Sequence, residues 1–297
     1  MPVPVADTGA MNFRRSFALL KASWGVLSTD KELLWLPVIS GICSLVVAAS
    51  FGVPIFLTGN ETTSTGSSGF ALGVPGYVLI ALTYFVLAYV TIFFNTALVW
   101  AANERLEGRD ATLGSALAAA RARAGVILPW AIVTATVSLI IRAIEERAGF
   151  IGRIVIGLIG VAWSLVTFLV LPLIVLEHVS VGAAIKESAS MFKRTWGENV
   201  IGQGGVGLVA LLAILVALPV AFLLFATGVT ALIVAAIVLG TVWIVGVMIV
   251  TSALSVVFQT ALYRYASSGT VPPGFTEDQI VGAFKAKKKR GLGAPSA

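Results

Sequence analysis

Charge is missing from five long stretches of this sequence. Neither Asp, Glu, Lys nor Arg occurs in residues 33–58, 74–102, 126–141, 154–176 or 200–263. A bilayer core about 30 Å thick is crossed by about 20 apolar residues of helix. Three of the stretches are therefore long enough for one crossing each, and the shorter stretch 126–141 is expected to cross as part of a span over 126–144. The last is long enough for two, because a glycine and two threonines offer the chain a turn between them.

The composition indicates a helical membrane protein. The chain is 58% hydrophobic and 11% charged, with a mean hydropathy of +0.98, which is too apolar for a soluble protein. Unpaired backbone groups are costly in lipid, so each span must be a helix or part of a closed barrel, and the apolar runs lack the alternation of a barrel strand. We therefore predict an all-α bundle. Its six expected spans are 33–58, 75–102, 126–144, 151–176, 200–226 and 229–263.

The residues of metal sites and hydrolytic triads are also scarce. Cys43 is the only cysteine, so no intrachain disulfide is expected, and His178 is the only histidine. A zinc site is therefore not expected, and no acid, base and nucleophile can be grouped. We predict a protein that is not an enzyme, with no catalytic, cofactor-binding or metal-binding residue. His178 is expected at a solvated helix end, with a proton-linked role as the alternative.

The basic residues predict the orientation. If the spans alternate in direction, 17 of the 20 Lys and Arg residues fall on the side of the N-terminus, and only Arg142, Arg147 and Arg153 fall on the other. Positive charge is enriched on the cytoplasmic side of membrane proteins. We therefore expect a multi-pass protein of the cell (inner) membrane with both termini in the cytoplasm.

Amphipathic segments precede the expected pairs of spans. Apolar side chains recur at helical spacing in 13–27 and 180–196, and more weakly in 112–124, with basic residues on other faces. Ser180 is expected to cap the second of these helices. The chain thus divides into three units, each an interfacial helix followed by a transmembrane hairpin. The expected boundaries are 1–11 for a disordered N-terminus, 12–107, 108–178 and 179–266 for the units, and 267–297 for a cytoplasmic tail with a short amphipathic helix.

This repetition, together with Phe192-Lys193-Arg194-Thr195-Trp196-Gly197-Glu198-Asn199, resembles a group of prokaryotic six-span membrane proteins of uncharacterised function. More loosely it is similar to the membrane region of some glycerophosphodiester phosphodiesterases. The resemblance covers about residues 12–266 and implies the six-span fold. It implies no catalytic residue, because the soluble phosphodiesterase domain has no counterpart in this sequence.

Uncharged polar residues gather toward one end of three expected spans. These residues are Asn95, Gln203, Ser252, Ser255 and Gln259. If their faces converge, they form a neutral polar pocket for a solute or lipid. The alternative is that they join helices by hydrogen bonds. The first outer loop, residues 59–69, is expected to be flexible and polar.

The C-terminal tail is strongly basic. Lys285, Lys287, Lys288, Lys289 and Arg290 are dense enough to bind anionic headgroups, and a solvated topology signal is the alternative. The partners expected are membrane lipids and other membrane proteins or a second copy, with no nucleic acid. The predicted function is a non-catalytic membrane protein that organises lipid or partner proteins at the cytoplasmic face. The alternative is a transporter or channel for a neutral solute or lipid.

Overall fold

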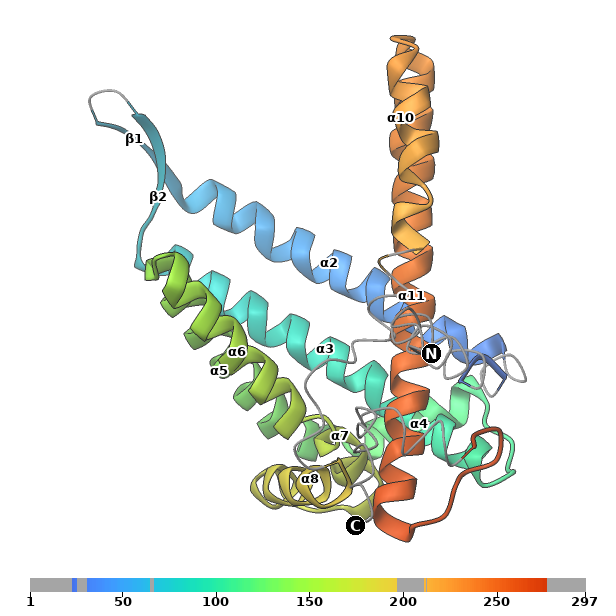
Figure 1. Ribbon diagram of the computed structural model, residues 1–297. Helices are drawn as coiled ribbons and strands as arrows, with labels where there is room; N and C mark the ends of the chain where they lie inside the picture. The colour runs from blue at the N-terminus through green and yellow to red at the C-terminus, as the bar shows by residue number, and fades with distance from the viewer. Residues whose placement is uncertain (1–22, 26–30, 65–66, 197–210, 212, 277–297) are drawn as a thin grey trace, which may run out of the picture.

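The computed structural model describes residues 23–25, 31–64, 67–196, 211 and 213–276. They form long helices and one β-hairpin (Figure 1). In chain order the elements are η1 (Lys31–Leu34), α2 (Trp35–Thr58), β1 (Gly59–Ser64), β2 (Ser67–Leu72), α3 (Val74–Leu106), α4 (Leu113–Ala122), α5 (Ala124–Arg147), α6 (Phe150–Val166), α7 (Val170–Pro172), the π-helix η2 (Leu173–Glu177), α8 (Val181–Trp196), α10 (Leu218–Ala226) and α11 (Thr230–Ser268).

Five helical segments of the described residues are long and apolar enough to cross a membrane. They are Glu32–Leu57, Val74–Leu106, Ala124–Arg147, Phe150–Glu177 and Thr230–Ser268. They confirm the helical class and the multi-pass character. The expected span 200–226 is described only from residue 211 onward, where Ala213–Ala226 forms a shorter apolar helix.

The elements sort to two ends of the bundle (Figure 1). We call one the basic end: it holds α4, α8 and the C-terminal ends of α3 and α11, in residues 103–123, 177–196 and 264–276. The other is the hairpin end, where the chain turns back in residues 59–72, 142–153 and 226–230. Helices occur at 113–122 and 181–196, where amphipathic helices are predicted. The predicted helices at 13–27 and in the tail lie largely or wholly outside the described residues.

The expected flexible loop after the first span is a β-hairpin instead. Strands β1 and β2 pair antiparallel in a register that runs from Gly59 opposite Leu72 to Ser64 opposite Ser67. The β-branched Thr62 and Thr63 favour extended backbone, and strand pairing satisfies backbone N–H and C=O groups. Because the segment is rich in polar residues, it was expected to form a loop and not a pair of strands.

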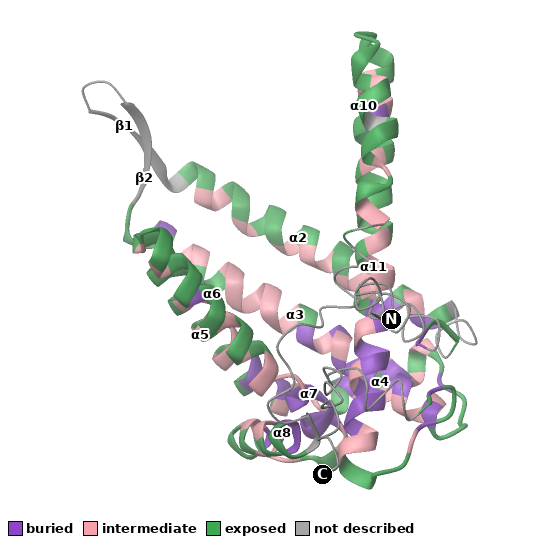
Figure 2. Ribbon diagram, in the orientation of Figure 1, coloured by how far each residue is buried: buried purple, intermediate pink, exposed green. Residues whose placement is uncertain are grey.

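The tightly packed core lies at the basic end. Figure 2 shows buried residues gathered around α4, α7 and the lower part of α11, whereas the upper helices are mostly exposed. Leu98, Leu173 and Leu262 are at most 1% exposed. Towards the hairpin end, Phe56 is 73% and Phe150 81% exposed. Such apolar surfaces suit lipid as the surrounding solvent.

Candidate functional site

The fourth expected span is broken near its middle. Helix α6 ends at Val166, and the chain resumes as the short α7 and the π-helix η2. Pro172 explains part of the break, because it has no N–H to donate to the carbonyl oxygen of Phe168, four residues earlier. The sequence identifies Pro172 as a source of a kink, but a break of this length is not expected.

Side chains from two other helices replace the missing helical bonds. Gln259 Nε2 of α11 donates a hydrogen bond to the carbonyl oxygen of Phe168. The backbone N–H of Leu169 donates to Ser188 Oγ of α8 at 3.1 Å. Because interrupted backbone at membrane depth is tolerated where protein covers and satisfies it, these two bonds hold the break in place.

The broken segment is also deeply enclosed. Leu169, Val170, Leu173 and Ile174 each have no exposed surface. Ser188 is likewise fully buried, so its hydroxyl is available to the protein interior and not to solvent. Broken and π-helical spans often accompany function in membrane proteins, which makes residues 167–178 the candidate site.

The lower end of the broken segment is tied to α11 a second time and to the start of α5. The Tyr263 hydroxyl of α11 donates to Glu177 Oε1 at 2.6 Å. His178 follows with a positive φ of 62°, a conformation that ends the helix. Its Nε2 accepts from the guanidinium of Arg123 at the start of α5. Both side chains lie at the basic end.

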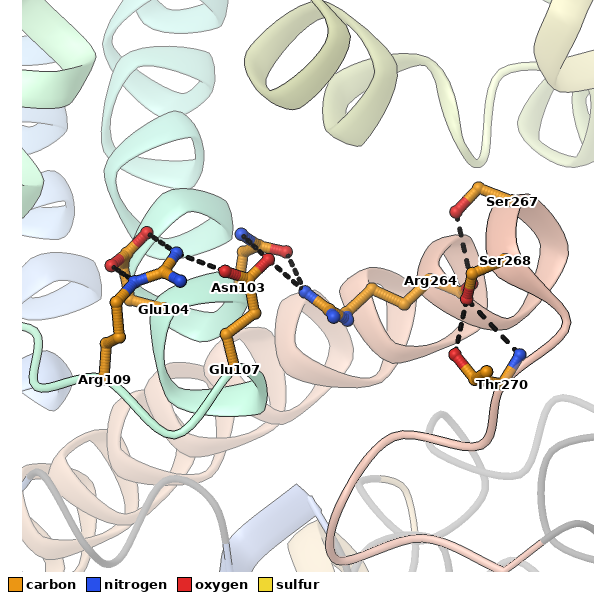
Figure 3. Close-up of polar contacts among 8 residues, drawn as sticks. All are labelled: Asn103, Glu104, Glu107, Arg109, Arg264, Ser267, Ser268 and Thr270. Carbon is orange, nitrogen blue, oxygen red and sulfur yellow. Dashed lines mark hydrogen bonds and ion pairs between the residues drawn. The ribbon is translucent and has the colours of Figure 1, made fainter.

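A second polar cluster joins α11 to α3 (Figure 3). Arg264 Nη1 contacts Glu107 Oε1 at 2.5 Å and Asn103 Oδ1 at 2.9 Å. Glu107 also pairs with Arg109, which binds Glu104 at 2.5 Å and 2.7 Å. The cluster fixes the end of the longest helix against the end of α3.

The electrostatics of this cluster favour the charged forms. Burial by itself raises the pKa of the Glu107 carboxyl. The hydrogen bond and charge of Arg264, with hydrogen bonds from Arg109 and Asn103, outweigh it and hold this pKa below its ordinary value. The hydrogen bond to Glu104 chiefly raises the pKa of Arg109. Near neutral pH the cluster is a network of opposite charges.

Helix α8 packs against the broken span and exposes cations. Its buried side is formed by Ala184, Ser188, Met191 and Phe192. The apolar spacing of the sequence predicts a stripe of Ile185, Ala189, Phe192 and Trp196. Of these Phe192 is buried, whereas Ile185 and Ala189 are half-buried and their neighbours Ala184 and Ser188 face inward. Ala183 N–H lies 3.5 Å from Ser180 Oγ, which confirms the predicted cap.

The structure places the residues of the predicted polar pocket as follows. Asn95 is partly buried in α3, and Ser252 is exposed on α11. Ser255 Oγ donates to the Thr251 carbonyl of its own helix at 2.8 Å. Gln259 joins two helices, as described above. Within the described part of the chain, no hydrogen bond joins any two of these four residues. Gln203 and the tail residues 285–290 lie outside it.

A comparison with protein families finds one match. Residues 74–273 match a family of unknown function, DUF6159. The chain belongs to this family. The match runs from the start of α3 past the end of α11 and includes both the broken span and the Arg264 cluster. No curated protein and no solved structure matches the chain.

Two features of this DUF6159 protein could not have been placed from sequence alone. Ser188 lies among charged residues of an amphipathic helix, where a serine normally faces water. Arg264 and Glu107 are 157 residues apart; in the sequence Arg264 counts among the basic residues that predict the orientation, and no role is predicted for Glu107. Among the described residues no group of three or more His, Cys, Asp or Glu side chains is placed to hold a metal ion.

Proposed function

We propose that this DUF6159 protein is a non-catalytic membrane protein that organises lipid or partner proteins at the cytoplasmic face. The observation that carries the proposal is the placement of α8. Its buried side docks on the broken span, while Lys186, Lys193 and Arg194 stay exposed at the basic end. An amphipathic helix with this distribution is suited to the surface of an anionic membrane.

The spacing of these cations supports lipid binding. Lys186 and Lys193 are seven residues apart, so they lie on the same side of α8, about 10 Å apart along its axis. Each basic residue near an anionic surface contributes about 1 kcal/mol of attraction. Two such residues on one rigid helix can hold neighbouring phosphate groups.

The bonding of the central polar side chains supports a structural role for the bundle. Gln259 and Ser188 are engaged by backbone groups of the broken span. Thr96 and Thr260 are fully buried, and each hydroxyl donates to a carbonyl of its own helix. These polar groups stabilise the helices that carry α8.

The test is lipid selectivity in reconstituted vesicles. Spin-labelled phosphatidylglycerol and phosphatidylcholine are compared for the fraction of lipid that the protein immobilises. The wild type should prefer the anionic lipid, and the preference should fall with added salt. The double variant Lys186→Gln, Lys193→Gln should lose most of it.

A matched control uses the other end of the molecule. Arg147 is exposed at the hairpin end, so Arg147→Gln should leave the selectivity for the basic-end leaflet unchanged. Equal selectivity of wild type and the double variant would overturn the proposal.

A second candidate function rests on the broken span itself. Discontinuous helices near the middle of the membrane form substrate sites in many transporters. The alternative is therefore a transporter or channel for a neutral solute or lipid. Proteoliposomes loaded with small neutral solutes should release them, whereas liposomes that hold the same solutes but no protein should not. Gln259→Met should alter the rate of release.

A further inference from the structure

A groove lies between α5 and α6 at the hairpin end. Its volume is about 830 Å³, which falls within the roughly 300–1,000 Å³ typical of small-molecule sites. Ser138, Ile141 and Arg142 of α5 line one side, and residues of α6 line the other. The groove is open, and both helices that line it are long and apolar enough to span a membrane, so lipid can reach it.

The rim of the groove carries both signs of charge. Arg142, Glu145 and Glu146 belong to the last turns of α5, and Arg153 belongs to the first turn of α6. They lie next to the turn between the two spans, which is the depth of the lipid headgroups. Two cations and two anions on one rim complement a headgroup that is itself zwitterionic.

Part of this charge is already positioned by the protein. Arg142 Nε donates to Glu146 at 3.3 Å, and Nη1 donates to the Tyr84 hydroxyl of α3. The guanidinium lies 5.8 Å from the centre of the Tyr84 ring. A guanidinium has five N–H donors, so Arg142 keeps donors for a phosphate. Across the described residues, no ion pair involves Glu145 or Arg153.

Beyond the charged rim, the α6 side of the groove is mainly apolar. Gly157 and Gly160 face open space, because a Cβ added at either position meets no atom within 4 Å. Trp163 lies further along the groove. Its ring stacks on Trp130 with 6.4 Å between the centroids. This wall suits an extended hydrocarbon chain.

The length of the groove matches one leaflet. From Arg153 at the rim to Ser164 near the far end the chain advances eleven residues, or about 16 Å along α6. Half of a hydrocarbon core about 30 Å thick is about 15 Å. The charged rim therefore lies where a lipid headgroup would be, and the apolar wall extends over the length of an acyl chain.

We propose that this groove binds one phospholipid with a primary amine headgroup, phosphatidylethanolamine. Arg142 and Arg153 contact its phosphate, and Glu145 and Glu146 accept hydrogen bonds from its ammonium group. An acyl chain lies over Gly157 and Gly160 toward Trp163. A trimethylated amine has no N–H to donate, and an anionic headgroup leaves Glu145 without a cation, whereas Glu146 keeps its ion pair with Arg142. The site is at the opposite end from α8, so it does not depend on the function proposed above.

The test uses the full chain, purified in detergent and stripped of lipid. Phosphatidylethanolamine, phosphatidylcholine and phosphatidylglycerol are added in equal amounts, and native mass spectrometry counts the lipid retained. The variant Lys186→Gln, Lys193→Gln, which lacks the anionic-lipid contacts proposed for α8, should retain one phosphatidylethanolamine about tenfold more strongly than either competitor. Glu145→Gln should bring phosphatidylethanolamine and phosphatidylcholine close to equal retention.

A groove-filling variant tests the location. Gly160→Leu places a side chain in open space and should abolish retention, with an unchanged helical circular dichroism spectrum. Gly157→Leu is a second such variant if the first is poorly folded. Arg147→Gln, an exposed residue outside the groove lining, should retain the lipid as the wild type does.

Three results would overturn the proposal. The first is wild-type retention in both folded glycine variants. The second is a preference for phosphatidylglycerol that persists in the variant Lys186→Gln, Lys193→Gln, which lacks the anionic-lipid contacts proposed for α8. The third is a dimer mass that disappears in Gly160→Leu, which would make the groove a contact between two copies of the chain.

Discussion

At the scale of single residues, Gln259 is the clearest test of how the bundle is held together. Its amide supplies the donor that Pro172 cannot give to Phe168. Gln259→Met keeps the size of the side chain and removes the donor, so the buried carbonyl loses a bond worth about 1–2 kcal/mol. The melting temperature in detergent should fall. Ser252→Ala on the same helix is the control, because Ser252 is exposed and the melting temperature should stay constant.

Glu107 should make the thermal stability of the protein depend on pH in the acidic range. Its pKa in the folded state lies below the ordinary value of 4.5, so the stability it contributes is present above that value and is lost as the pH falls through the folded-state pKa. Between pH 7 and about pH 3 the wild type should lose more thermal stability than Glu107→Gln. The side chains of Glu107 and Arg264 are 28% and 26% exposed, so added salt should narrow the difference. Parallel acid curves for the two proteins would contradict this account.

Sequence reasoning reached some of these residues but not their partners. The spacing of polar residues in an uncharged span picked out Gln259. Its acceptor is a backbone carbonyl 91 residues away, and only the packing of α11 against the break reveals it. The same limit applies to Arg142 and Arg153, which sequence counts as topology charges, whereas the structure places both on the rim of one groove.

At the scale of elements, a glycine at the end of α11 and one in its interior should respond to substitution in opposite ways. Gly269 ends the helix with φ at 71° and donates its N–H to the Tyr265 carbonyl at 2.8 Å. Gly269→Ala should destabilise the protein by about 1 kcal/mol, because the left-handed conformation strains a Cβ. Gly246 lies within the same helix with nothing near its missing Cβ, and Gly246→Ala should stabilise it by about 0.5–1 kcal/mol. Unfolding in sodium dodecyl sulfate measures both. The same sign for the two variants would contradict the assignment of the helix end.

The long apolar helices could be predicted, because only an apolar helix is stable across a lipid bilayer. The break in the fourth span and the β-hairpin could not. A run without charge predicts a span whether or not its helix is continuous. The break at Thr167–Leu169 therefore has no signal in the sequence other than Pro172. The hairpin of β1 and β2 was missed for a related reason, since threonine and serine favour both loops and edge strands. The apolar pattern reports what faces lipid, whereas both exceptions depend on backbone hydrogen bonds.

At the scale of the whole molecule, the orientation in the membrane is the prediction that matters most. With Cys43 replaced by Ala, Ser67→Cys at the hairpin end should react with an impermeant maleimide added to intact cells. Ser190→Cys, exposed on α8, should react only after the membrane is opened. The reason is the concentration of Lys and Arg at the basic end. Labelling of Ser190→Cys in intact cells would reverse the orientation.

The length of α11 bears on how deeply the protein sits in the bilayer. This helix has 39 residues, about 58 Å, or nearly twice the hydrocarbon thickness. From Thr230 to Tyr263 it carries no charge, so lipid alone leaves it able to slide along the membrane normal. Arg264, anchored to Glu107 at the end of a second span, stops that sliding. One ion pair thus sets the vertical register of the longest helix, and a change in membrane thickness would be met by tilt of α11 rather than by movement of its anchored end.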